Sequence, residues 1–94
     1  LDGISENKNG NNKQITVYPN PFNQTTTIDW SEWNNLSPVT ISVFDVTGNL
    51  VYKSSNLLTK NIALSKNNLP SSGMYLFMVQ SPDITLTGKF ILQK

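Results

Sequence analysis

Apolar and polar residues alternate with a period of two along most of this chain. The alternation is clear in the short runs that begin at Ile15, Thr26 and Val39, and it returns in later runs, the last of which is interrupted by Gly88 and forms one strand or two. This period places side chains on alternate faces of a strand. The predicted strands are residues 15–18, 26–30, 39–43, 50–53, 61–64, 74–79 and 84–92. About seven short strands without a helical segment predict an all-β fold, an immunoglobulin-like antiparallel β-sandwich.

Two parts of the chain depart from simple alternation. Phe44 and Val46 are apolar on the parity opposite to the strand before them, which predicts a bulge, or burial on both faces, near Asp45. The following Thr47–Asn49 segment predicts a tight turn, because its glycine tolerates a positive φ. Met74–Val79 is almost continuously apolar and predicts a central, well-buried strand.

Two prolines, Pro19 and Pro21, stand two residues apart after the first predicted strand. In an extended chain, residues i and i+2 direct their N–H groups to the same edge, and proline has no N–H. Asn20 between them keeps a donor for the opposite edge. We therefore expect residues 18–22 to form an extended edge segment that pairs on one side only and is anchored by Phe22.

Composition and charge narrow the range of functions. The chain of 94 residues suffices for one small domain, with residues 1–14 predicted to be a flexible linker from an upstream protein and residues 15–94 the domain. It contains no Cys and no His, and therefore no disulfide, thiol or imidazole. The net charge of +1 comes with scattered lysines, which argues against nucleic-acid binding and against a polybasic membrane patch. No apolar run approaches the roughly 18–20 residues of a membrane span.

Candidate chemistry is sparse. Asp29 and Glu32 are the only close pair of carboxylates in the predicted domain, and they lack His, Cys or Arg as partners, so we predict no catalytic residue and no enzyme activity. The acidic spacing matches no calcium loop, and we expect no metal and no cofactor. Trp30 shares a face with Ile28 and is expected in the core, whereas Trp33 is expected to cap one end of the sandwich. The alternative for both tryptophans is a platform that stacks on sugar rings.

Three sequence elements follow one another in a characteristic order. They are Tyr18-Pro19-Asn20-Pro21-Phe22; Phe44-Asp45 with Gly48, Leu50 and Val51 after it; and Leu69-Pro70 followed by Gly73-Met74-Tyr75 and a final strand that closes on a lysine. In this order they resemble the type A C-terminal sorting domains of the type IX secretion system, also called the Por secretion system. Members of that family commonly place two residues between the leucine and the glycine. Here three stand between them, which predicts a longer turn or a bulge.

The resemblance implies an export signal of Bacteroidetes-type bacteria rather than a catalyst. Such domains are read in the periplasm and steer an upstream cargo through the outer-membrane translocon, after which a surface sortase commonly removes them. The implied partners are the type IX translocon, an outer-membrane shuttle protein and the sortase, and the final location is the cell surface or the medium. By the same resemblance, the recognition candidates are Tyr18, Pro19, Asn20, Pro21, Phe22, Gly48, Gly73, Tyr75, Lys89 and Lys94.

Two other functions remain open from the residues alone: a carbohydrate-binding or adhesive module of a secreted enzyme, and a structural spacer. Among the recognition candidates, we expect Gly73 to serve backbone geometry and Tyr75 to pack in the core. The Lys89–Lys94 segment therefore remains as a candidate surface for direct recognition. Its strand edge is expected to be free for addition of a partner strand. We expect a monomer without a nucleic-acid partner, and cleavage in the linker.

Overall fold

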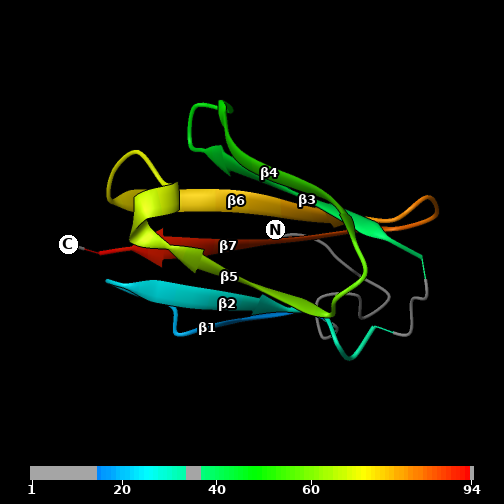
Figure 1. Cartoon of the computed structure of the whole chain (residues 1–94). Coiled ribbons are helices and arrows are strands. Elements are labelled where there is room, and N and C mark those ends of the chain that lie inside the picture. Colours follow the sequence, from blue (N-terminus) through cyan, green and yellow to red (C-terminus); the bar gives the residue numbers. More distant parts are fainter. Residues whose placement is uncertain (1–14, 34–36, 94) are drawn as a thin grey trace.

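The computed structural model describes residues 15–33 and 37–93 and is built almost entirely of strands. The described residues form seven strands and one helical turn, and the strands lie in two layers (Figure 1). The elements are β1 (Thr16–Tyr18), β2 (Thr25–Asp29), β3 (Val39–Asp45), β4 (Leu50–Leu57), β5 (Asn61–Ser65), the 3-10 helix η3 (Lys66–Asn68), β6 (Gly73–Gln80) and β7 (Thr85–Leu92). The prediction of about seven short strands is therefore confirmed.

The strands form two antiparallel sheets that pack face to face. One sheet has the order β1-β2-β5 and the other the order β4-β3-β6-β7. If the strands are lettered A to G along the chain, these orders are A-B-E and D-C-F-G. An immunoglobulin constant-type domain has the same arrangement except that its strand D pairs with E. The immunoglobulin-like sandwich expected from the sequence is thus the observed architecture.

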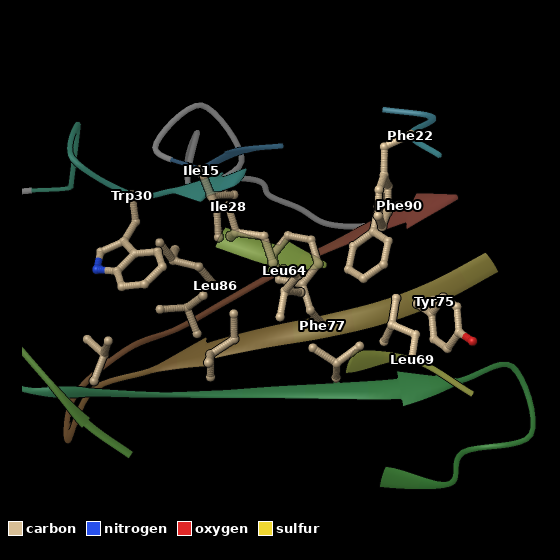
Figure 2. Close-up of a cluster of buried hydrophobic side chains, with 14 of the residues drawn as sticks. Ile15, Phe22, Ile28, Trp30, Leu64, Leu69, Tyr75, Phe77, Leu86 and Phe90 are labelled. Carbon is tan, nitrogen blue, oxygen red and sulfur yellow. The ribbon is translucent and has the colours of Figure 1, made fainter. Parts of the chain in front are cut away.

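The core lies between the inner faces of the two sheets. Alternate residues of each strand point inward, as in Ile28 of β2, Leu64 of β5, Val43 of β3, Phe77 of β6 and Phe90 of β7, and all five are almost fully buried. Figure 2 shows four of them, Ile28, Leu64, Phe77 and Phe90, packed between the sheets together with Trp30 and Leu86. The sandwich is therefore held together mainly by removal of these apolar surfaces from water.

The burial of β6 differs from the prediction for Met74–Val79. The strand is central, since it pairs with β3 on one side and β7 on the other. However, only Tyr75, Phe77 and Val79 are buried, while Met74 and Leu76 are exposed on the outer face. The prediction of a well-buried strand is therefore wrong for half of its side chains, because an apolar run does not reveal whether both faces are covered.

The last apolar run forms one strand, β7, and not two. Gly88 lies within β7, is paired with Phe77 of β6, and occupies a position on the inner face of the sheet. A Cβ at Gly88 would come within 2.5 Å of the Phe77 ring. The glycine thus makes room for the aromatic ring across the strand pair, an arrangement in which the ring also covers the glycine backbone.

The irregularity predicted near Asp45 is present. The pairing of β3 with β4 changes register between Val43 and Phe44, which is the signature of a bulge. The predicted turn follows at residues 46–49, where Gly48 has a φ of +92° and gives its N–H to the Asp45 carbonyl. The sequence pattern therefore located the turn and the irregular pairing beside it. The extra residue, however, is Val51 of β4, and the pairing of β3 with β6 stays regular through Asp45.

The expectation of an extended edge strand over residues 18–22 is wrong. β1 is an edge strand that pairs only with β2, but it ends at Tyr18, and residues 19–21 are bends. The peptide bonds before Pro19 and Pro21 are both cis. The segment leaves the three-stranded sheet and crosses to the other one, where Phe22 forms a parallel bridge with Leu92 of β7.

Candidate functional site

One end of the sandwich gathers most of the residues singled out in the sequence. The connection from β1 to β2, the turn from β3 to β4, the start of β6 and the end of β7 all lie at this end (Figure 1). Register places them together, because Gly73 pairs with Leu92 and Asp45 with Tyr75. The three sequence elements, which are separated along the chain, therefore form one region of the surface.

The proline-rich connection is hydrogen-bonded to the outer edge of β7. The Asn20 side chain accepts a hydrogen bond from the Ile91 N–H at 2.9 Å and donates to the Lys89 carbonyl at 3.4 Å. The Phe22 N–H donates to the Ile91 carbonyl, and the Gln93 N–H donates to the Phe22 carbonyl. The edge expected to be free for strand addition is thus occupied from Lys89 to Gln93.

A buried threonine holds the other side of this connection. Thr26 of β2 points into the core and has no exposed surface. Its hydroxyl donates to the Pro19 carbonyl at 2.7 Å, so the buried polar group is satisfied and the bend is fixed to the three-stranded sheet. Sequence reasoning missed Thr26, because an inward threonine in an alternating strand carries no mark of its distant partner.

Phe22 belongs to an aromatic cluster rather than to an exposed surface. Its ring meets that of Phe90 edge-on, with centroids 5.7 Å apart. Phe90 in turn stacks on Tyr75 at 5.6 Å and on Phe77 at 6.0 Å. Figure 2 shows Phe22 reaching down onto Phe90 and Tyr75 lying further along the same layer. These contacts join the first and third sequence elements through the core.

The Tyr75 hydroxyl fixes the loop before β6. It donates to the Ser71 carbonyl at 2.5 Å, four residues upstream. This is the geometry of the tyrosine corner of immunoglobulin-like sandwiches, where a tyrosine near the start of strand F bonds back to the preceding backbone. The extra residue between Leu69 and Gly73 lies in this loop, and Gly73 itself has a φ of +141° that other residues rarely adopt. Tyr75 therefore packs in the core, as expected, and Gly73 has a backbone conformation that suits glycine.

Two aspartates organise local turns in the same way. The Asp45 carboxylate accepts hydrogen bonds from the Thr47 hydroxyl and from the N–H groups of Thr47 and Asn49. These bonds, that of the Thr47 hydroxyl above all, lower the pKa of Asp45. The pKa of Asp29 is also lowered, chiefly by its hydrogen bond from the Ser31 hydroxyl at 2.6 Å. Both carboxylates are thus engaged in turn structure.

The remaining recognition candidates are placed on or near the surface. Tyr18 is exposed and its hydroxyl donates to Asp29 at 3.4 Å, while Pro19, Asn20, Pro21, Gly48 and Lys89 are also exposed. Lys94 lies outside the described residues. A shallow cleft of about 400 Å³ opens beside the end of β7. It is lined by Asn23, Lys66, Asn67, Leu69, Pro70, Ser71, Ser72, Leu92 and Gln93.

The tryptophans do not form a sugar platform. Trp30 and Trp33 are 1% and 5% exposed, so neither ring is open to a ligand. Trp30 packs in the core as expected, and Trp33, which was expected to cap one end, is buried in the same cluster. Residues 15–33 and 37–93 contain no cluster of three His, Cys, Asp or Glu side chains suited to a metal ion. In the same described part, no helix has the length and hydropathy of a membrane span.

A comparison with known protein families identifies the family of this chain. The family model described as the secretion system C-terminal sorting domain matches residues 16–93. The chain belongs to this family. The sorting domain is a C-terminal signal for type IX secretion, and it implies export to the cell surface or secretion by interaction with the type IX machinery. Sorting domains of this family are not catalytic. No curated protein matches the chain.

Proposed function

We propose that this sorting domain is read as a folded unit during passage through the periplasm, by the outer-membrane translocon and its shuttle protein. The upstream cargo then reaches the cell surface, where a sortase removes the domain, and the domain takes no part in catalysis. The family match over residues 16–93 carries this proposal. It is supported by the assembly of all three sequence elements at one end of the sandwich, because a receptor there meets them together.

The recognition candidates divide into two groups by burial. Phe22 and Tyr75 are buried in the aromatic cluster and support the site from within, whereas Gly73 is exposed and sets the backbone at the start of β6. Tyr18, Pro19, Asn20, Pro21, Gly48 and Lys89 are exposed and available for direct contact. We propose that Lys94 belongs with this second group and that the sortase cuts within residues 1–14.

Deleting Lys89–Lys94 is not a clean test of this function. That segment includes Phe90 and Leu92, which are buried in the core. Their removal would unfold the sandwich, so loss of export would not show that the segment is read. The informative experiment therefore changes exposed side chains and keeps the fold.

The test fuses the whole chain to the C-terminus of a periplasmic reporter in a bacterium with a type IX system. We expect the reporter to appear outside the cell and to lose the mass of the domain. Export should stop in a strain without the translocon. A reporter that stays in the periplasm, or one that leaves equally well without the translocon, would contradict the proposed function.

A further inference from the structure

The outer face of the four-stranded sheet carries apolar side chains that the folded chain leaves exposed. Leu50, Leu76, Met74 and Ile91 are 52%, 46%, 43% and 39% exposed, and Phe44 beside them is half-buried. These five residues are called the outer patch. They come from all four strands of the sheet, and they lie at the end that also holds the three sequence elements.

Strand register makes the outer patch continuous. Phe44 is paired with Leu50 on one side and with Leu76 on the other, and Leu76 is paired with Lys89. Met74 is paired with Ile91 one step nearer the end of the sandwich. Directly opposed side chains have their Cβ atoms about 4.5–5.5 Å apart, so these residues touch across the strands. A contiguous apolar surface of this kind commonly marks an interaction site.

The charges around the outer patch favour a particular kind of partner. Lys89 continues the row through Leu50, Phe44 and Leu76, and Lys53 lies in the next row, opposite Ser42. Asp45 follows Phe44, and its carboxylate is engaged by hydrogen bonds within the β3–β4 turn. The outward positions of the paired residues in this sheet carry no Asp or Glu in the described part of the chain. A complementary surface is therefore apolar at its centre and acidic at its margin.

A protein surface fits these features better than a lipid membrane. Binding to an anionic membrane commonly uses clusters of about 4–8 basic residues, and this face offers two. Met74, together with the half-buried Met78 in the next row, adds adaptable side chains that suit contact with a shaped protein surface. We infer that the outer patch docks onto a component of the type IX machinery that presents an apolar surface bordered by carboxylates.

This inference rests on the proposed function, and the experiment separates the two. The whole chain is fused to the exported reporter, and Leu76 and Ile91 are both changed to threonine, which keeps the preference for strands. The matched control is Thr25→Ala with Ala63→Thr on the outer face of the three-stranded sheet. A second variant, Lys89→Glu, reverses a charge at the margin of the patch. Near-UV circular dichroism checks the fold, and the single Leu76→Thr variant replaces any variant that unfolds.

We expect the double variant to lower export at least tenfold, Lys89→Glu to lower it several-fold, and the control to leave it unchanged. A photo-crosslinker at position 76, but not at position 63, should join the domain to an identified component of the type IX machinery. If the unmodified fusion is exported and the double variant is exported equally well, the inference is overturned and the proposed function stands. If the unmodified fusion stays in the cell, both fall.

Two other occupants of the outer patch would also overturn the inference. The first is a second copy of this chain, revealed by a concentration-dependent dimer that the double variant abolishes. The second is a membrane, revealed if vesicles with anionic lipid bind the unmodified chain and not the double variant. Either result without a crosslink to the secretion machinery would assign the patch to that occupant instead.

Discussion

The two sheets of this sorting domain are alike on their inner faces and different on their outer ones. Inside, both contribute fully buried apolar residues, such as Ile28 and Leu64 from one sheet and Phe77 and Phe90 from the other. Outside, the three-stranded sheet presents mainly threonine, asparagine and serine, with Tyr18 as the one large exposed apolar side chain among its described residues. The four-stranded sheet presents the several apolar residues of the outer patch. Folding explains why both inner faces are apolar, because the two faces are buried against each other. Folding does not explain why the outer face of one sheet is polar and that of the other carries an apolar patch. This difference between the outer faces is therefore the better guide to function.

The sharpest way to test this comparison uses two neighbours on β7, one on each face. Phe90→Ala removes a ring that contacts Phe22, Tyr75 and Phe77, and we expect it to lower the free energy of unfolding by about 3–5 kcal/mol. Ile91→Ala on the outer face should cost less than about 1 kcal/mol. Urea denaturation of the two variants measures both values. Equal losses would mean that the outer patch is covered in the folded chain.

A second test adds volume to the inner face instead of removing it. In Gly88→Ala the new Cβ would lie 2.5 Å from the Phe77 ring, which is itself buried against Phe90 and has little room to move. We expect a loss of about 1–3 kcal/mol from overpacking. The outward neighbour Thr87→Ala should change stability by about 0.5 kcal/mol or less. A neutral Gly88→Ala would show that the ring can shift freely, against the close packing described here.

A third test addresses the connection that joins the two sheets. Asn20→Ala removes the hydrogen bonds to Ile91 and Lys89, and we expect a loss of about 1–2 kcal/mol, since each such bond contributes about 0.5–1.5 kcal/mol. Hydrogen exchange at the Ile91 amide should become faster than in the parent. Asn23→Ala, an exposed change in the same connection, is the control. Unchanged protection at Ile91 would show that the side chain does not hold the edge.

The smallest expected effect concerns the turn aspartates, one at each sheet. The pKa of Asp45 is lowered in the fold, so its contribution to stability is complete above about pH 4 and is lost as the pH falls through the lowered value. Asp45→Asn should therefore flatten the decline of the melting temperature in acid, and Asp29→Asn should do the same for the other sheet. Melting curves between neutral and acid pH check this. Variants that decline in parallel with the parent would contradict it.

The sequence predicted those features that depend on neighbouring residues. Alternation located the strands, and the shared face of Ile28 and Trp30 placed the tryptophan in the core. Each of these follows from the period of two in a strand, which is visible without knowledge of the partner. The family resemblance added the role of a type IX sorting signal, and the match over residues 16–93 confirmed the family.

The failures share a dependence on residues distant in the chain. Asn20 finds its partners on β7 about seventy positions away, so the local pattern of two prolines suggested an extended edge that does not exist. Gly88 left it open whether the last apolar run forms one strand or two, because the close approach of the Phe77 ring across the sheet cannot be read from neighbouring residues. The exposed outer half of β6 was missed for the same reason. An apolar run shows what could be buried, and only the topology shows what is available to cover it.

The hydrogen bond between Asn20 and Ile91 also bears on the order of folding. It joins residues 71 positions apart, and β7 is the last of the seven strands to be synthesised. Contacts of such separation form late, because a long loop must close before they contribute to stability. A partly synthesised domain holds Asn20 and Phe22 without their partners on β7. The assembled end of the sandwich therefore reports that the whole domain has been made, and a receptor that binds there selects completed chains.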